Sequence, residues 1–312
     1  MAKIDGGEMV VRMLRQEGIT TLFVLHGGHL DSLLQAAVRH DLRLVDTRHE
    51  QAAGHAADGW ARTTGQTGVA VVTAGPGLTD CVTAIANAYL DGIPTLFIAG
   101  AAPLGEAETL PLQGGLDQVA IVEPITKWAH RVTNPQRIPD LVAQALRIAR
   151  SGRPGPVLLE VPIDVLFATA EESALTIPSS AIAAAPPAPP VEVVDEVIDR
   201  LAAAQRPAIY AGGGAWFSGA ETALVTFAET TGIPVFMNAK ARGMVPAAHP
   251  LCGGGFTSLA MASMIGVEST DCLLVLGGRL GLFTGGRSDA MIPAPVAFEV
   301  YRDNLPTEQQ IV

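Results

Sequence analysis

Glu50 begins a segment in which an acidic side chain is followed by small residues, Glu-Gln-Ala-Ala-Gly-His. An acid at a helix start ordinarily caps free amide groups and complements the helix dipole. The Ala and Gly residues that follow also leave room for a planar ring to approach the backbone. A carboxylate beside such a ring can share a proton with it, and imidazole can do the same near neutral pH. The candidate acid–base groups of this region are Glu50, His26, His29 and His49.

A second candidate feature is the turn Thr73-Ala-Gly-Pro-Gly77, which directly follows an apolar run. It does not match a dinucleotide-binding fingerprint, because Gly75-Pro-Gly-Leu-Thr-Asp80 lacks the third glycine. It does not match a phosphate-binding loop either, because no Gly-Lys-Ser/Thr follows. From its residues alone, the turn is either a plain strand-to-helix connection or a place where the backbone approaches a ligand.

Taken together, these segments resemble the thiamine-diphosphate enzyme family that contains acetolactate synthase, oxalyl-CoA decarboxylase, 2-hydroxyacyl-CoA lyase and benzaldehyde lyase. The resemblance extends from near the N-terminus to about Ala290. Five linked motifs are more specific than any one of them alone. The matching segments keep the order and spacing of the family and are Arg48–Arg62, Thr73–Gly77, Ile85–Pro94, Leu112–Asp117 and Ile125–Trp128.

The resemblance implies a role for each matching residue. Glu50 stands where the family has the carboxylate that hydrogen-bonds the cofactor's aminopyrimidine ring and promotes proton transfer. His29 and Gln113 stand where the family handles the hydroxyl and carbonyl groups of the substrate. The implied cofactor contacts are Glu50, Thr73, Gly75, Pro76, Gly77 and Asn87, and the implied substrate pocket contains His26, Gly28, Leu112 and Ile163.

Within the family, Leu25-His-Gly-Gly-His-Leu30 is most similar to benzaldehyde lyase and bacterial 2-hydroxyacyl-CoA lyases. Ile163 departs from that pattern, because benzaldehyde lyase is expected to have a tryptophan there. The implied function is a thiamine-diphosphate-dependent carbon–carbon lyase or carboligase acting on 2-hydroxyacyl or 2-hydroxyketone substrates. Two alternatives stay open. One is acetolactate synthase-like condensation of 2-oxo acids, with a middle-domain flavin (FAD) that is considered but not favoured. The other is a non-catalytic remnant that only binds cofactor or dimerises.

The family's diphosphate-binding domain begins with Gly-Asp-Gly and supplies the ligands of Mg²⁺, and the 312 residues contain no Gly-Asp-Gly. The sequence therefore predicts a truncated or split enzyme with no metal ligand in this chain. Little activity is expected from the isolated chain, because most affinity for such a cofactor comes from contacts to phosphate and metal. The expected partners are further copies, as a dimer or tetramer, or a chain that supplies the diphosphate domain.

Predicted strands and helices, which must position these residues, alternate along the first half of the chain. Alternation of this kind predicts an α/β fold with a doubly wound parallel sheet, whose ligands bind at the carboxyl ends of the strands. Strand patterns cover Thr21–Leu25, Leu42–Asp46, Gly68–Thr73, Pro94–Gly100 and Pro156–Pro162. Helical patterns cover Gly6–Glu17, Leu30–His40, Glu50–Thr64, Asp80–Asp91 and Pro139–Ser151.

A Pro/Ala-rich stretch then separates two such domains. Its four prolines favour an extended spacer, so the expected organisation is a pyrimidine-binding domain over residues 1–180, a linker over 181–191 and a truncated middle domain over 192–312. In the second domain, helices are expected at Val191–Ala204 and Gly219–Thr231, and strands at Arg206–Ala211, Pro234–Met237, Cys272–Leu276 and Pro295–Val300.

Composition narrows the classes of ligand. The net charge of −11, without a basic cluster, argues against nucleic acid and anionic lipid surfaces and favours a small-molecule substrate. The sequence contains no run of about 18 apolar residues, so no membrane span is expected. The first residues lack the apolar core of a signal peptide, so a cytoplasmic location is expected. The three cysteines, Cys81, Cys252 and Cys272, are too widely spaced for a zinc site and are expected as small apolar residues.

Overall fold

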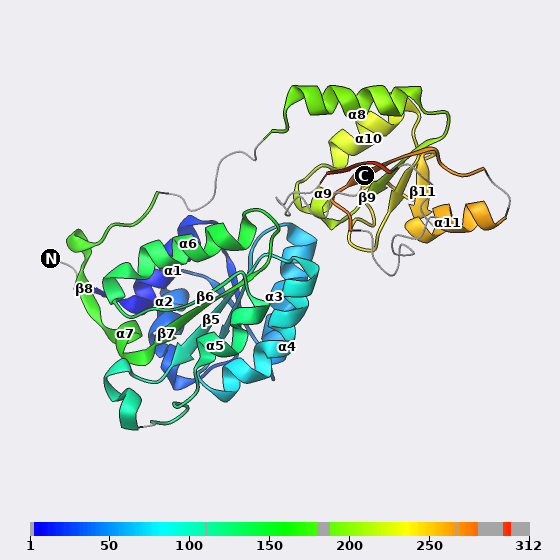
Figure 1. The fold of residues 1–312 in the computed structure, drawn as a ribbon. Helices are drawn as coiled ribbons and strands as arrows, with labels where there is room; N and C mark the ends of the chain where they lie inside the picture. The colour runs from blue at the N-terminus through cyan, green and yellow to red at the C-terminus, as the bar shows by residue number, and fades with distance from the viewer. Residues whose placement is uncertain (1–2, 110, 180–187, 266–267, 280–295, 301–312) are drawn as a thin grey trace. The chain divides into compact units, whose positions relative to one another are not determined.

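The computed structural model describes residues 3–109, 111–179, 188–265, 268–279 and 296–300. The chain divides into two compact units, unit 1 (Met1–Ala185) and unit 2 (Pro186–Val312). Each unit is built on a parallel sheet flanked by helices, which confirms the expected α/β class (Figure 1). Most of the linker predicted at 181–191 lies outside the described residues, so its bounds stay a prediction.

In unit 1, the described residues form a six-stranded sheet in the order β3-β2-β4-β5-β7-β6, and every pair in it is parallel. From β2 the chain places β3 on one side, whereas β4 and then β5 lie on the other side. The strand order therefore reverses next to β2, and such sheets bind ligands where the order reverses. The strands are β2 (Thr21–Val24), β3 (Arg43–Asp46), β4 (Gly68–Val72), β5 (Thr95–Ala101), β6 (Trp128–Arg131) and β7 (Pro156–Pro162).

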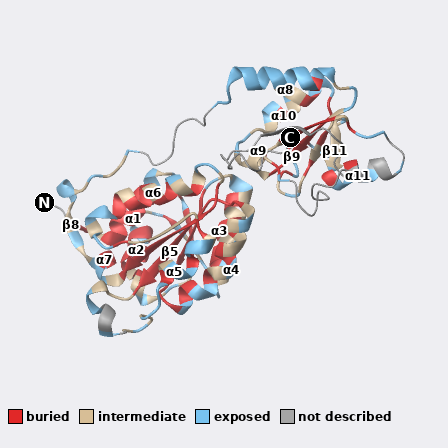
Figure 2. Cartoon of the chain, viewed as in Figure 1, coloured by how far each residue is buried: buried red, intermediate tan, exposed pale blue. Residues whose placement is uncertain are grey.

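The side chains of each buried strand alternate between two hydrophobic layers. In β4, Val69 and Val71 join the larger layer, whereas Ala70 and Val72 join the smaller one. Figure 2 shows the resulting buried sheet between helices whose outer faces are exposed. The larger layer packs under α1 (Gly6–Gln16), α2 (Asp31–Arg39) and α6 (Ile138–Arg150), and the smaller one under α3 (Glu50–Thr64), α4 (Pro76–Asp91) and α5 (Gln118–Val122).

Local capping explains where the helices near the candidate site begin. His49 is the N-cap of α3, and its Nδ1 accepts a hydrogen bond from the Gln51 amide at 3.2 Å. Gly75 is the N-cap of α4, and Pro76 occupies the first helical turn, where its missing N–H costs nothing. The sequence pattern placed the start of this helix at Asp80, which is wrong, because Pro76 was assigned to the turn and not to the helix.

Smaller elements complete unit 1. The antiparallel pair β1 (Lys3–Asp5) and β8 (Thr169–Glu171) was not expected from the sequence, and neither was the edge strand β6. Short helices are η1 (Gly28–Leu30), η2 (Leu104–Thr109), η3 (Glu123–Ile125), η4 (Pro135–Arg137), α7 (Ile163–Phe167) and η5 (Glu172–Ala174).

In unit 2, the described residues form a parallel sheet in the order β11-β10-β9-β12-β13. Its strands are β9 (Pro207–Ala211), β10 (Val235–Met237), β11 (Cys252–Gly255), β12 (Cys272–Leu276) and β13 (Val296–Val300). One face packs under α8 (Val191–Ala203) and α10 (Glu221–Thr231), with α9 (Gly213–Phe217) after β9, and the other under α11 (Phe256–Met264). Within the described residues, no helix is both long and apolar enough to cross a membrane.

Candidate active site

The residues that the sequence singled out gather, with one exception, at the carboxyl edge of the unit 1 sheet. The segment after β2 carries His26 and His29, the segment after β3 leads to Glu50, and the segment after β4 is the Thr73–Gly77 turn. Ile163 follows β7 and is half-buried. Because all these strands run in the same direction, their following segments meet at one edge.

Glu50 is the first residue of α3 and is half-buried. Among the described residues, its carboxylate makes no hydrogen bond or ion pair within the chain, whereas its backbone carbonyl accepts a hydrogen bond from the Cys81 thiol at 3.4 Å. Burial and then the nearby Glu50 carboxylate raise the pKa of the Cys81 thiol to about 12, so it stays a neutral donor. The backbone of Glu50 is therefore fixed while its carboxylate remains available to a ligand.

The glycine turn lies directly beside this carboxylate. Gly75 has φ 62° and ψ −114°, a conformation that favours glycine. A Cβ built on Gly77 would lie 3.3 Å from Glu50 Oε1 and 2.7 Å from Thr73 Cγ2. Glycine at 77 thus leaves the space in front of the carboxylate open, as a flat ring needs if it is to reach both Glu50 and the backbone.

His29 packs against the same turn. Its Nδ1 lies 3.4 Å from the hydroxyl of Thr73, which is itself buried. A Cβ built on Gly100, near the end of β5, would lie 2.7 Å from the His29 Cβ. Burial lowers the pKa of His29, which favours a neutral imidazole near pH 7. A neutral imidazole can accept a proton or donate a hydrogen bond, as the predicted substrate role requires.

The remaining predicted substrate residues differ in their surroundings. Gln113 has φ 61°, unusual for a residue with a side chain, and a Cβ on Gly75 would meet its carbonyl at 3.0 Å. Leu112 is 83% exposed, so the pocket that it was predicted to line is open on that side. His26 is exposed and its Nε2 lies 2.7 Å from Asp31 Oδ1, while a Cβ on Gly28 would meet no atom of the described residues within 4 Å.

Asn87 is the exception. It lies on α4 about three helical turns beyond Gly75, roughly 18 Å along the helix axis. Within unit 1 it is therefore not brought to the carboxyl edge, and its predicted cofactor contact stays a prediction.

One group of potential metal ligands includes Glu50. Ligand atoms of His49, Glu50 and Asp80 lie within 4.8 Å of one another, and His49 Nε2 is 3.8 Å from Asp80 Oδ2. His49 and Asp80 are exposed, and exposed acidic groups often gather without an ion. This grouping therefore leaves untested the prediction that the chain supplies no metal ligand.

The sequence did not reveal Gln118, a buried residue at the start of α5. Its Oε1 accepts a hydrogen bond from the Gly75 amide at 2.7 Å, and its Nε2 donates to the Gly100 carbonyl at 3.0 Å. Its side chain is hidden from solvent, with 3% of the residue exposed. Both partners are far away in sequence, so no local pattern could have indicated this role.

The carboxyl edge of unit 2 is arranged differently. A Cβ built on Gly212 would lie 2.3 Å from the Gly278 Cα, and one built on Gly277 would lie 2.4 Å from the Ala215 amide nitrogen. The glycine turns that follow β9 and β12 thus pack on each other, backbone against backbone. Their glycines are required by this packing whether or not a ligand binds there.

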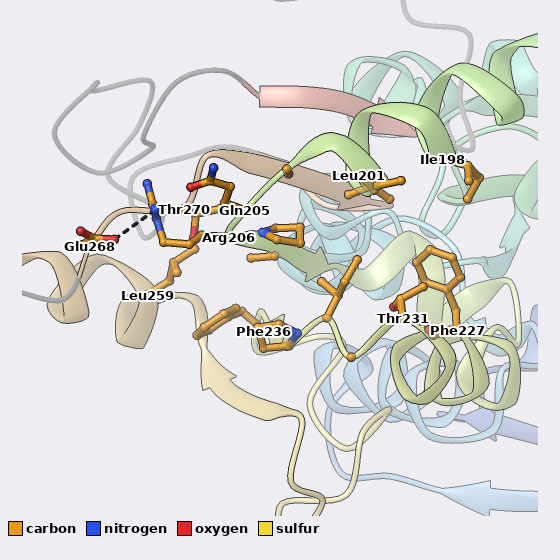
Figure 3. A pocket seen from close by; sticks show the side chains of 17 residues that line it. Ile198, Leu201, Gln205, Arg206, Phe227, Thr231, Phe236, Leu259, Glu268 and Thr270 are labelled. Atoms are coloured by element: carbon orange, nitrogen blue, oxygen red, sulfur yellow. Dashed lines mark hydrogen bonds and ion pairs between the residues drawn. The ribbon is translucent and has the colours of Figure 1, made fainter.

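Unit 2 also has a pocket of about 780 Å³, at the amino ends of its strands. Its wall is mainly apolar and includes Leu201, Phe236 and Leu259 (Figure 3). Its charged groups are paired within the chain, because Arg206 bonds Glu268 at 3.0 Å and donates to the Ser269 carbonyl at 2.8 Å. The polar groups at its rim therefore do not indicate a charged ligand.

Comparison with known proteins decides the family. The model for the N-terminal TPP binding domain of thiamine pyrophosphate enzymes matches residues 4–121, and the model for their central domain matches residues 194–306. The chain belongs to the thiamine pyrophosphate enzyme family. The match to a TPP binding domain indicates thiamine pyrophosphate as the cofactor, and the carboxyl edge with Glu50 lies within the matched residues.

Curated relatives extend the comparison. The chain is 38% identical over 303 residues to the large subunit of acetolactate synthase isozyme 1 from Escherichia coli, covering 93% of this chain and 51% of the relative. It is 36% identical to an acetolactate synthase large subunit from Mycobacterium tuberculosis, covering 97% and 57%. It is also 36% identical to a probable 2-ketoarginine decarboxylase from Pseudomonas aeruginosa, covering 89% and 49%. The chain thus spans about half the length of the curated relatives it matches.

These relatives alter the interpretation of the sequence. The predicted similarity to benzaldehyde lyase and 2-hydroxyacyl-CoA lyase is not confirmed, and neither is a lyase acting on 2-hydroxyacyl substrates. The relatives favour the alternative, an acetolactate synthase-like enzyme. The local motifs at His29 and Gln113 suggested the lyase branch, but the match over nearly the whole chain favours the other one.

Proposed function

We propose that this chain forms the ring-binding part of an acetolactate synthase-like active site, in which thiamine pyrophosphate promotes condensation of 2-oxo acids. The observation that carries the proposal is the Glu50 carboxylate, which lies beside a glycine that leaves its oxygens uncovered and has no hydrogen bond or ion pair among the described residues. A carboxylate left in this way is suited to hydrogen-bond a ring nitrogen.

The surrounding residues have distinct tasks in this proposal. Glu50 holds the aminopyrimidine ring of the cofactor and exchanges a proton with it, while the Gly75 and Gly77 backbone lies against the ring. When bound, thiamine pyrophosphate supplies an electron sink for the carbanion chemistry. Thr73 orients His29 through the 3.4 Å contact between its hydroxyl and Nδ1. His29 and Gln113 then hydrogen-bond the carbonyl and carboxylate oxygens of the 2-oxo acid.

The class of substrate is supported by the relatives. Two of those described are named acetolactate synthases, and another is named for decarboxylation of a 2-keto acid. We therefore assign 2-oxo acids as substrates in place of 2-hydroxyketones. The name "large subunit" supports assembly with further chains, and we propose that residues outside this chain hold the diphosphate and Mg²⁺. A flavin in unit 2 is not part of the proposal.

Calorimetry tests the role of Glu50. Thiamine pyrophosphate with MgCl₂ is titrated into the purified chain, and Glu50→Ala is expected to weaken binding at least tenfold, because a charge-assisted hydrogen bond contributes about 1.5–3 kcal/mol. Glu221→Gln, which changes an acid in the first turn of α10 in unit 2, is the matched control and is expected to bind as wild type. Equal affinities for wild type and Glu50→Ala would contradict the proposed site.

A product assay tests the reaction class. The chain, assembled with the residues proposed to hold the diphosphate and Mg²⁺ and supplied with thiamine pyrophosphate and Mg²⁺, is incubated separately with pyruvate and with benzoin, and acetolactate and benzaldehyde are measured. Acetolactate formation above the Glu50→Ala background supports the proposal. Release of benzaldehyde without acetolactate would reverse it in favour of the lyase.

A further inference from the structure

One buried side chain joins the glycine turn that follows β4 to the end of β5. Gln118 accepts from the Gly75 amide at 2.7 Å and donates to the Gly100 carbonyl at 3.0 Å. Gly75 precedes the helix that carries Gly77, which lies beside Glu50. Gly100 is the residue against which His29 packs. One amide group thus contacts both the cofactor side and the substrate side of the edge.

The conformation of Gly75 makes this contact important. With φ 62° and ψ −114°, Gly75 is outside the regions that regular structure stabilises, and no side chain caps α4. Its buried amide would lose a hydrogen bond if Gln118 were absent, because a buried polar group is costly when unpaired. The bond to Gln118 therefore selects this turn over others that the flexible glycine could adopt.

Gln118 is itself held in place from several directions. It opens α5, whose N-cap Asp117 accepts from the Ala120 amide at 3.4 Å. The same short helix is anchored by Val122, which is fully buried in the smaller hydrophobic layer of unit 1. Both functional groups of the Gln118 amide are satisfied, so its orientation is fixed as well as its position.

We propose that Gln118 is a positioning residue, which sets the distance between the pyrimidine-holding turn at Gly75–Gly77 and the His29 side of the site without touching the substrate. This inference rests on the proposed function, because it concerns how Glu50 and the glycine turn bind the cofactor ring. Loss of the amide leaves the fold intact but lets the Gly75 turn move away from Glu50. Cofactor affinity then falls although every residue that contacts the cofactor is unchanged.

A buried serine elsewhere in unit 1 provides a matched control. Ser32 Oγ accepts from the Gly7 amide at 3.1 Å and donates to the Leu166 carbonyl at 3.1 Å, so it makes the same pair of backbone contacts as Gln118. Ser32 is also buried, with 2% exposed. It joins α1, α2 and α7, whose buried apolar residues belong to the larger layer and not to the layer that contains Val122. Ser32→Ala therefore removes an equivalent bridge without touching the Gly75 turn.

The experiment combines two readouts on Gln118→Met, which keeps the length of the side chain but has no amide. Labelling alanine carbonyls with ¹³C and glycine amides with ¹⁵N selects four Ala–Gly pairs in the sequence, at Gly54, Gly75, Gly100 and Gly212. Hydrogen exchange of the Gly75 amide is expected to speed up at least tenfold, while that of Gly212 in unit 2 does not change. Affinity for thiamine pyrophosphate with MgCl₂, measured by calorimetry, is expected to fall about tenfold. Ser32→Ala is expected to change neither.

Gln118→Glu serves as the conservative variant and as a substitute if Gln118→Met does not fold. It keeps an acceptor for the Gly75 amide but replaces the Nε2 donor to the Gly100 carbonyl with an oxygen, so slow exchange at Gly75 is expected together with a cofactor affinity below that of wild type. Faster exchange at Gly75 with unchanged affinity would show a structural role only and would overturn the inference, as would unchanged exchange. If the wild type does not bind the cofactor, the proposed function fails and the inference fails with it. Exchange of the Gly75 amide does not depend on the cofactor, so it still shows whether the hydrogen bond to Gln118 forms.

Discussion

Two regions of unit 1 each have an acid and a glycine near a helix start, but these residues have different roles. One region is the contact of α1 with α2, and the other is the carboxyl edge of the sheet. At the contact of α1 with α2, Glu8 accepts hydrogen bonds from Arg12 at 2.7 Å and Arg39 at 3.1 Å, and its Oε1 lies 2.5 Å from His40 Nε2. At the carboxyl edge, the Glu50 carboxylate has no such partner among the described residues. An acid saturated by its own chain stabilises the fold, whereas an acid left uncovered is available to a ligand.

The pKa values express this difference. Burial by itself would raise the pKa of Glu8, but the hydrogen bonds from His40, Arg12 and Arg39 outweigh it and lower the pKa to about 2. A carboxylate held so firmly in its charged form cannot accept a proton near neutral pH. The cluster around Glu8 therefore contributes to stability and is unsuited to acid–base catalysis.

The glycines of the two regions differ in the same way. A Cβ built on Gly7 would lie 2.3 Å from the Ser32 carbonyl carbon and 2.5 Å from the Leu33 nitrogen, so α1 and α2 touch there through their backbones. A Cβ on Gly28, at the carboxyl edge, would meet nothing within 4 Å among the described residues. The first glycine is required by packing, and the second leaves space open.

Among these changes, Gly7→Ala is expected to cause the largest loss of folding stability. The new methyl group would force α1 and α2 apart, because the atoms it meets are backbone, and the expected loss of stability is at least about 3 kcal/mol. Urea denaturation followed by circular dichroism measures the change. A loss below 1 kcal/mol would mean that the two helices can separate without cost.

Acid is expected to remove the contribution of Glu8. Because its folded pKa lies near 2, below the ordinary value of 4.5, the stabilisation is complete above about pH 4.5 and is lost as the pH falls toward 2. The contribution is on the order of 2–3 kcal/mol. Urea midpoints between pH 2 and pH 6 measure it, and the slope should be smaller in Glu8→Gln.

Glu8→Gln at neutral pH is expected to destabilise unit 1 by about 2 kcal/mol, because it removes the negative charge that Arg12, Arg39 and His40 share. Glu50→Gln is the matched change at the carboxyl edge, and it is expected to alter stability by less than about 0.5 kcal/mol while weakening cofactor binding. Equal losses of stability in the two variants would remove the distinction between the regions.

Gly28→Ala is expected to have the smallest effect on folding, within about 0.5 kcal/mol of wild type, because its Cβ would project into open space. Any effect should appear in binding, since the methyl group would occupy part of the predicted substrate pocket. Chemical denaturation and calorimetry on the same preparation separate the two. A large loss of stability would show that the space at Gly28 is filled.

Much of the fold followed from the sequence because its strands are continuous apolar runs. The predicted helix Gly6–Glu17 and the observed α1 differ only at the last residue. The edge strand β6 was missed because its residues, Trp-Ala-His-Arg, are half-buried and show no apolar run. The start of α4 was misplaced because a proline after a glycine indicates a turn as readily as a first helical turn.

The candidate site could be predicted only where a motif carried it. Glu50 and Thr73–Gly77 belong to contiguous segments, and the fold brings those segments to one edge. Gln118 could not be predicted, because its role depends on Gly75 and Gly100, which only the tertiary structure brings to it. The predicted branch of the family was not confirmed, because a few residues near His29 indicated the lyases whereas the relatives that match nearly the whole chain favour acetolactate synthase.

The pairing of β1 with β8 has a consequence for how unit 1 can be rebuilt. These strands come from opposite ends of the unit, Lys3 opposite Glu171 and Asp5 opposite Thr169, and ion pairs from Lys3 to Glu171 and from Arg12 to Glu172 support the junction. Contact between strands so far apart in the sequence forms slowly, although the entropic cost of closing the loop between them grows only with the logarithm of its length. A circular permutant that links β8 to β1 by a short hairpin would make this contact local. Such a permutant should fold faster than the natural order while leaving the Glu50 edge unaltered.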